Sequence, residues 1–235
     1  MAEENRTRSI RETESNADGG TRPADLRGSD PTANFERLEI GALDASGVGE
    51  ALDVTARGMR DNPLHVAAFG DDPDLRLRKL RRMFGAAAEV LDLHRNMLVA
   101  RDPNGAIVGV CGTMPPGGCR PSIGQQLRLM PQLLANGPSA TLRTARWLGA
   151  WAKRDPKTPH WHLGPVAVDA HLQGAGIGSR LMEAYCARVD AADDDAYLET
   201  DKPANVRFYE RFGFEVVGEQ GILGVPNWFM LRPTR

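Results

Sequence analysis

A glycine-rich segment between a strand pattern and a helix pattern constrains this chain more than any other part of the sequence. The segment is Gln173-Gly174-Ala175-Gly176-Ile177-Gly178-Ser179. Glycine has no Cβ, so the backbone amides of such a segment can approach a ligand closely. Amides at the N-terminus of a helix also favour phosphate groups. A tight strand-to-helix turn that binds nothing is the simpler interpretation, so the surrounding sequence has to decide between the two.

Two other phosphate-binding motifs fit this segment less well. A dinucleotide-binding fingerprint requires Gly-x-Gly-x-x-Gly, and Glu199 stands where its ribose-binding acid would stand, but Ser179 takes the place of the last glycine. Fewer than sixty residues follow the segment, which are too few to complete a doubly wound sheet. A Walker phosphate loop is excluded because no Gly-Lys-Ser or Gly-Lys-Thr follows.

Apolar periodicity on both sides of the segment predicts a mixed α/β domain. Apolar alternation and short apolar runs predict strands, whereas apolar residues at helical spacing predict helices. The Asn-Gly pair at 104–105 is a strong turn signal and predicts a hairpin. We expect strands at 35–40, 96–100, 106–110, 160–168, 196–199, 214–217 and 227–231, and helices at 43–60, 73–90, 123–134, 140–153, 176–189 and 205–212.

Composition places the chain among globular proteins and excludes several classes. The 235 residues suffice for one domain with a substantial core. Residues 1–33 carry almost no sizeable apolar side chains, so we expect a disordered tail there and a folded domain over 34–235. The net charge of −2 argues against a general nucleic-acid binder. No signal peptide, membrane span or disulfide framework is evident, so we expect a cytoplasmic protein without nucleic-acid or membrane partners.

The glycine-rich segment resembles the pyrophosphate-binding motif of the Gcn5-related N-acetyltransferase (GNAT) family. A second motif, at 205–214, is similar to that family's helix with an asparagine and a tyrosine. The resemblance extends to 163–168, which correspond to the family's splayed central strand, and to 69–73, which are similar to the puromycin N-acetyltransferase-like branch. Residues 115–159 match only in position, and we expect them to form a helical insertion.

The resemblance implies an α/β (α+β) fold with a central mixed, mostly antiparallel sheet flanked by helices. Two adjacent parallel strands would splay apart and leave a slot for acetyl-CoA as co-substrate, with the pantetheine arm along the backbone of Val166 and Val168. The residues implied to bind acetyl-CoA are Val166, Ala167, Val168, Gln173, Gly174, Ala175, Gly176, Ile177, Gly178, Ser179 and Asn205.

Acetyl transfer to an amine needs a base and an acid. An alkyl amine with a pKa of about 10.4 is protonated at neutral pH, and the departing thiolate needs a proton. The resemblance makes Tyr209 the acid and lets amides near 166–168 hold the acetyl oxygen, whereas core packing is the alternative role of Tyr209. Glu199, at the C-terminal end of a predicted strand, is the candidate base or else a solvent-facing carboxylate. Asn205 would bind the cofactor arm or the amides at the start of its helix.

Two histidines and a basic stretch are the other candidate functional features of the sequence. His160 and His162 share one side of a strand, which permits proton relay or metal ligation, but two histidines without a third ligand are a weak metal signal and we predict no metal. Residues 103–154 contain six lysines and arginines and no acidic residue. They form either a solvated basic face or a surface that overhangs the acceptor and attracts anionic groups.

The sequence therefore predicts an acetyl-CoA-dependent N-acetyltransferase that acts directly on a primary amine of a small molecule or a peptide. The alternative is a non-catalytic acyl-CoA-binding sensor that regulates a partner. Tyr209 and Asn205 favour the enzyme, because a sensor needs the glycine-rich segment but not the acid. The sequence does not choose among an aminoglycoside, a puromycin-like amine, a small metabolite and a protein amine, and it leaves open whether the chain forms a homodimer.

Overall fold

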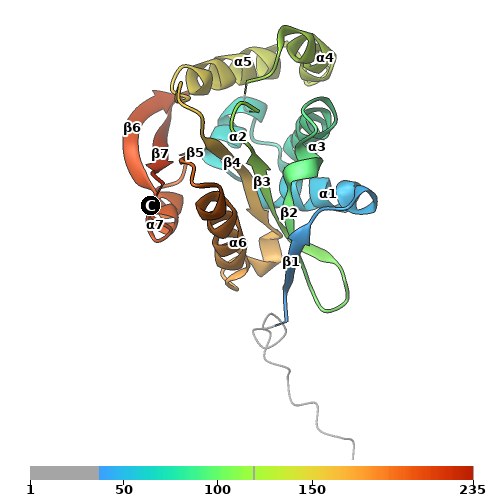
Figure 1. Ribbon diagram of the computed structural model, residues 1–235. Coiled ribbons are helices and arrows are strands. Elements are labelled where there is room, and N and C mark those ends of the chain that lie inside the picture. Colours follow the sequence, from blue (N-terminus) through green and yellow to red (C-terminus); the bar gives the residue numbers. More distant parts are fainter. Residues whose placement is uncertain (1–36, 119, 235) are drawn as a thin grey trace, which may run out of the picture. The chain divides into compact units, whose positions relative to one another are not determined.

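The computed structural model describes residues 37–118 and 120–234, and the tail expected at 1–33 lies outside them. Seven strands form one sheet, with helices on both faces (Figure 1). The strands are β1 (Glu39–Ala42), β2 (Leu98–Arg101), β3 (Ile107–Met114), β4 (Trp161–Val168), β5 (Ala196–Thr200), β6 (Glu215–Ile222) and β7 (Val225–Arg232). The helices are α1 (Val48–Met59), α2 (Pro63–Phe69), α3 (Pro73–Val90), α4 (Ile123–Leu134), α5 (Pro138–Ala152), α6 (Ile177–Ala192) and α7 (Pro203–Glu210).

The strand order is β1-β2-β3-β4-β5-β7-β6, and only β4 and β5 run parallel to each other. This arrangement confirms the expected mixed, mostly antiparallel sheet. β4 and β5 pair at Trp161 with Ala196 and at His162 with Tyr197, although both strands continue beyond these pairs. The two strands therefore separate after their first residues.

A bulge in β4 explains where the separation begins. The pairing of β3 with β4 shifts its register between Cys111 and Thr113. A Cβ on Gly112 would lie 2.6 Å from the carbonyl oxygen of Gly164, so only glycine fits at this close approach. Gly164 itself has a φ of 145°, which L side chains rarely adopt. Because a bulge bends its strand, β4 turns away from β5 directly after the two paired residues.

Three apolar clusters hold the helices on the sheet. On one face, α6 and α7 pack through Leu181, Tyr185 and Tyr209 against sheet residues that include Leu163 and Leu198. The opposite face is covered in two parts. One part joins α1 to β2, β3 and β4, and its buried members are Ala51, Val54, Met97, Val99, Ile107, Val110 and Ala167. The other part joins α2, α3 and α5 to β5, β6 and β7, and its larger members are Leu64, Phe69, Leu80, Trp147, Tyr197, Ile222 and Phe229.

Most elements begin and end close to the predicted residues, and the largest difference lies between 43 and 73. The helix expected at 43–60 is a short 3-10 turn at Ala45–Gly47 followed by α1. α2 was not predicted, because seven residues are too few to show a helical period. Asp72 caps α3, since its side chain accepts hydrogen bonds from the first backbone amides of that helix. β1 begins at Glu39, and residues 35 and 36 of the expected first strand lie outside the described residues.

Helices α4 and α5 occupy 123–152, within the region expected to be a helical insertion. Ser122 and Gln125 form a reciprocal capping box at the start of α4. Several arginines of the basic stretch contact the rest of the domain: Arg143 donates a hydrogen bond to the carbonyl of Ala68, and Arg120 pairs with Asp155. Across 37–118 and 120–234, no helix is long and apolar enough to cross a membrane.

Candidate active site

The last residues of β4 line the place where the sheet opens. β4 is a central strand, yet only Leu163 and Ala167 are buried in it, and Val166 and Val168 are half-buried. The amide of Asp169 donates to the carbonyl oxygen of Val108 in β3 at 3.0 Å. Because amides alternate sides along a strand, those of Val166 and Val168 point away from β3. They face the edge from which β5 has separated.

The glycine-rich loop follows β4 and leads into α6. Gly174 and Gly176 have φ values of 88° and 82°, in the left-handed region that favours glycine. A Cβ on either residue would meet nothing within 4 Å, so both lie beside open space. The side chain of Gln173 donates to the carbonyl oxygen of Val168 at 3.3 Å, which ties the loop to the end of β4. The loop thus brings backbone amides to the N-terminus of α6.

The other predicted residues of this loop differ in exposure. Ile177 is buried in the core beneath α6, so only its backbone can face a ligand. Ala175, Gly178 and Ser179 are half-buried. Gly178 lies against α7, since its Cβ position is 3.6 Å from the ring of Phe208. The start of α6 and the middle of α7 are therefore in contact.

Helix α7 carries Asn205 and Tyr209 one turn apart. Asn205 is half-buried, and Tyr209 is 8% exposed and packs against the rings of Phe208 and Phe214. Burial raises the pKa of the Tyr209 phenol above its ordinary value, and negative charge on Cys111 and Asp201 would act in the same direction. The phenol is therefore protonated at neutral pH and able to donate.

Glu199 lies on the opposite face of the sheet from Tyr209. Side chains alternate along β5, so Leu198 points to the core that contains Tyr209, whereas Tyr197 and Glu199 point to the other face. The Glu199 side chain is only 3% exposed, which excludes the solvent-facing alternative. Its Oε2 atom lies 3.0 Å from Nε2 of His162 on β4.

A cluster of titratable side chains adjoins Glu199. Oδ1 of Asp155 lies 3.2 Å from Nε2 of His160 and 3.5 Å from Nδ1 of His162. Burial alone would raise the pKa of Asp155, but hydrogen bonds from His162 and Arg120 and the charges of both histidines lower it to about 2. Sequence reasoning named the two histidines and missed Asp155. The available signal was that Asp155 is the first acidic residue after the acid-free stretch, five residues before His160.

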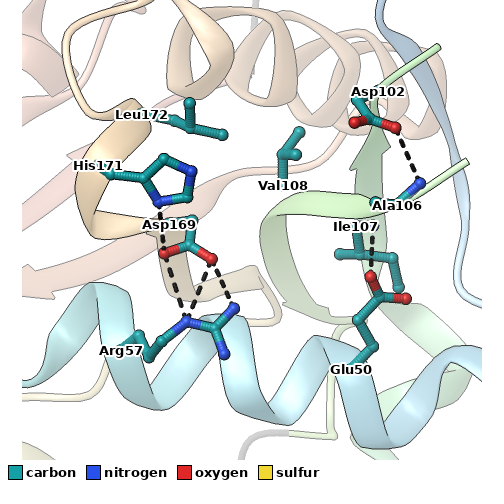
Figure 2. Close-up of a pocket in the computed structure, with 9 residues that line it drawn as sticks. All are labelled: Glu50, Arg57, Asp102, Ala106, Ile107, Val108, Asp169, His171 and Leu172. Carbon is teal, nitrogen blue, oxygen red and sulfur yellow. Dashed lines mark hydrogen bonds and ion pairs between the residues drawn. The ribbon is translucent and has the colours of Figure 1, made fainter. Parts of the chain in front are cut away.

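A cavity of about 390 Å³ lies beside the end of β4, and none of the predicted catalytic or cofactor-binding residues lines it. Its lining residues are Glu50, Arg57, Asp102, Ala106, Ile107, Val108, Asp169, His171 and Leu172. Figure 2 shows Arg57 reaching from α1 to the carboxylate of Asp169, which His171 also contacts at 3.3 Å. This ion pair joins α1 to the residue that follows β4, so it supports the loop rather than forming the site.

Comparison with known proteins gives a consistent result. Residues 71–214 match the model of the acetyltransferase (GNAT) family. The histone acetyltransferase HPA2 and related acetyltransferase from Corynebacterium glutamicum is 26% identical, with a TM-score of 0.64 over 84% of this chain and 97% of that chain. Arylalkylamine N-acetyltransferase 2 from Aedes aegypti has a similar fold, with 13% identity and a TM-score of 0.59 over 85% of this chain and 100% of that chain. A GNAT family acetyltransferase from Brucella melitensis, solved in complex with acetyl-CoA, is 19% identical. Its TM-score is 0.47, over 83% of this chain and 87% of that chain.

Proposed function

The chain belongs to the GNAT family of acetyltransferases, and we propose that it transfers the acetyl group of acetyl-CoA directly to a primary amine. One observation carries this proposal: β4 and β5 separate after two paired residues, and Glu199 and Tyr209 lie on the two faces of the sheet beside that separation. Direct transfer needs a base where the amine enters and an acid where the thiol leaves. Two such groups on opposite faces meet that requirement.

The donor would lie along β4 and end at the glycine-rich loop. Amides at the N-terminus of α6, beside Gly174 and Gly176, suit a pyrophosphate because they combine unpaired N–H groups with the positive end of the helix dipole. The amides of Val166 and Val168 face the opening and suit the pantetheine arm. Asn205, half-buried on α7, offers a hydrogen bond to the same arm.

Glu199 would act on the acceptor. The amine arrives as an ammonium ion, and Glu199 takes one proton from it, with His162 holding the carboxylate in place by its hydrogen bond at 3.0 Å. The neutral nitrogen then attacks the thioester carbonyl carbon. Amides near 166–168 would stabilise the oxygen of the tetrahedral intermediate.

Tyr209 would act on the leaving group. When the intermediate collapses, the carbon–sulfur bond breaks and the sulfur takes the electron pair. The phenol of Tyr209 gives its proton to that sulfur, so CoA leaves as a thiol. The product nitrogen loses its remaining extra proton to solvent, which gives the neutral amide. Glu199 then releases its proton to solvent, and the Tyr209 phenolate takes one back. Burial raises the pKa of the Tyr209 phenol, so the proton is present at neutral pH when the sulfur departs.

The acceptor class that we propose is a primary amine on a small molecule or a peptide. Residues 69–73, which are similar to the puromycin N-acetyltransferase-like branch, form the turn from α2 to α3, with Gly70 at a φ of 95°. This similarity puts puromycin-like amines on the panel to be tested. The similarity to a structure described as a histone acetyltransferase puts lysine peptides there as well.

Two measurements test the proposal. Acetyl-CoA at about one hundred times its Kd should stabilise the protein by about 2.7 kcal/mol, which a thermal shift detects. Thiol release from acetyl-CoA should then depend on the added amine across small amines, puromycin-like compounds and peptides. No stabilisation would overturn the donor assignment. Stabilisation without amine-dependent release from any panel member would overturn the acceptor assignment.

A further inference from the structure

Next to Glu199, the carboxylate of Asp155 and the imidazoles of His160 and His162 lie close together. We propose that Asp155, His160 and His162 form a binding site for a divalent transition-metal ion, with Zn²⁺ as the ion to be tested, through Oδ1, Nε2 and Nδ1 respectively. The three ligands do not include Tyr209, Glu199 or the glycine-rich loop, but the site adjoins the proposed base, because His162 also contacts the carboxylate of Glu199 at 3.0 Å.

The spacing of the three ligand atoms fits such an ion. Oδ1 of Asp155 lies 3.2 Å from Nε2 of His160 and 3.5 Å from Nδ1 of His162, and all three atoms lie within 4.8 Å of one another. Zinc–nitrogen and zinc–oxygen bonds of about 2.0–2.1 Å in a tetrahedral arrangement place ligand atoms about 3.3 Å apart. The two distances from Asp155 are therefore close to those of a zinc site.

The far side of each imidazole carries the partner that a metal-bound histidine needs. Nδ1 of His160 lies 2.8 Å from the carbonyl oxygen of Thr158, and Nε2 of His162 lies 3.0 Å from the carboxylate of Glu199. Metal-binding histidines almost always donate their second N–H to a carbonyl or a carboxylate, which fixes the tautomer and the ring orientation. Both histidines therefore present a lone pair toward Asp155.

A cation at this point fits the contacts on both sides of the two rings. A neutral imidazole has one N–H group, and each of these rings has an oxygen atom near both nitrogens. When the N–H points to the outer oxygen, of Thr158 or Glu199, the other nitrogen offers a lone pair on the side of Asp155. A single ion beside Oδ1 of Asp155 satisfies both rings at once.

The surroundings hold the ligands in place and balance the charge of the ion. Arg120 donates from Nε to Oδ2 of Asp155 at 2.9 Å, which directs Oδ1 toward the histidines. The side chains of Asp155 and His160 are 6% and 2% exposed, and Tyr197 packs its ring 5.5 Å from each histidine ring. The carboxylates of Asp155 and Glu199 together offset a double positive charge. His162, 21% exposed, marks the side on which solvent can supply a fourth ligand.

The donor set selects the class of metal. Two imidazole nitrogens suit Zn²⁺ and its neighbours in the first transition series, whereas Mg²⁺ and Ca²⁺ prefer sites made of oxygen atoms alone. The proposal therefore predicts binding of Zn²⁺ and Co²⁺, and no binding of Mg²⁺ at the same site.

Metal binding is measured on the full chain after removal of any polyhistidine tag and of adventitious metal. We expect one Zn²⁺ per chain by competition with a chromophoric chelator, and with Co²⁺ the intense visible absorption of a four-coordinate ion. Asp155→Asn and His162→Gln should each weaken Zn²⁺ binding by about tenfold or more, by analogy with the loss seen for groups that only support a ligand. His171→Gln is the matched control, because that histidine is 73% exposed and pairs with Asp169 outside the cluster.

Folding of each variant is checked by its thermal unfolding without metal, and Asp155→Asn serves because it keeps the size of the side chain. Absence of saturable Zn²⁺ binding by the wild-type chain would overturn the proposal. Equal Zn²⁺ affinity in wild type, Asp155→Asn and His162→Gln would also overturn it. Because the readout uses no acetyl-CoA, failure of the proposed transferase activity would not alter either outcome.

Discussion

The carboxylate of Glu199 and the imidazole of His162 meet at 3.0 Å across the only parallel strand pair found among the described residues. His162 lies in the last paired position of β4, and Glu199 lies two residues beyond the last paired position of β5. The contact therefore spans the point where the strands begin to separate. It fixes a buried carboxylate on the face opposite Tyr209, which is the placement that the proposed proton transfer from an acceptor amine requires.

Glu199→Gln should lower kcat by about 10²- to 10⁴-fold, the usual contribution of general acid–base catalysis. Glutamine keeps the size of the side chain and can still accept the hydrogen bond from His162, but it cannot take a proton. The KM for acetyl-CoA should stay unchanged, because Glu199 faces the acceptor. Steady-state thiol release measures both constants, and Glu210→Gln, an exposed carboxylate on α7, is the control. A variant with wild-type kcat would remove Glu199 from the mechanism.

Tyr209→Phe should lower turnover while leaving acetyl-CoA binding nearly unchanged. The variant removes only the hydroxyl, so the ring still packs against Phe208 and Phe214. Acetyl-CoA affinity, measured by calorimetry, should change by no more than about tenfold, since one neutral hydrogen bond contributes about 0.5–1.5 kcal/mol. We expect turnover to fall by about 10²-fold or more for loss of the acid. Equal turnover would contradict the assignment of Tyr209.

The features that sequence analysis predicted are those that neighbouring residues determine. The φ values of Gly174 and Gly176 depend on the local turn, and the positions of Asn205 and Tyr209 depend on the period of one helix. The hairpin at Asn104-Gly105 is local in the same sense, and β2 and β3 flank it as predicted. Such features follow from spacing alone, so contiguous motifs were sufficient to find them.

The features that it missed depend on contacts between distant parts of the chain. The pairing of Glu199 with His162 follows from the register of β4 on β5, which places His162 opposite Tyr197. The contact of Asp155 with both histidines depends on how the chain returns from α5 to β4. Strand periodicity places His160 and His162 on one side but gives no information about a third group. Local patterns could therefore name the histidines without revealing their cluster.

Gly176→Arg should abolish acetyl-CoA binding. Gly176 has a φ of 82°, and its Cβ position lies beside open space at the N-terminus of α6, where the proposed pyrophosphate would lie. An arginine there brings backbone strain of about 1–3 kcal/mol and a side chain that blocks the loop. Gly224→Arg separates the two effects, because Gly224 has a φ of 81° with equally open space but lies between β6 and β7.

Both variants should lose similar thermal stability, and only Gly176→Arg should lose the calorimetric signal of acetyl-CoA binding. If both variants bind acetyl-CoA as tightly as the wild type, the glycine-rich loop is not the phosphate site. If both lose binding, strain in the fold rather than the loop is responsible.

The domain should become less stable as the pH drops below about 6.5, because of His65. The direction of this change follows from the pKa of that histidine in the folded state. His65 is 3% exposed in α2, its Nδ1 donates to the carbonyl of Met59 at 2.7 Å, and its ring packs 5.2 Å from that of Trp147. Burial lowers the pKa of this histidine from its ordinary 6.5, with Lys202 and Arg76 acting in the same direction and Asp201 opposing them. A lowered pKa in the folded state means that the unfolded chain binds the proton first. Stability is therefore complete above about pH 6.5 and is lost as the pH falls toward the folded-state pKa.

Urea unfolding followed by tryptophan fluorescence at several pH values measures this loss. One proton corresponds to a slope of up to about 1.4 kcal/mol per pH unit in the free energy of unfolding. His65→Gln keeps a donor near Met59 but does not titrate, so it should be less stable than the wild type at pH 7.5 and approach it as the pH falls to 5.5. Parallel pH profiles of the two proteins would contradict a neutral, buried His65.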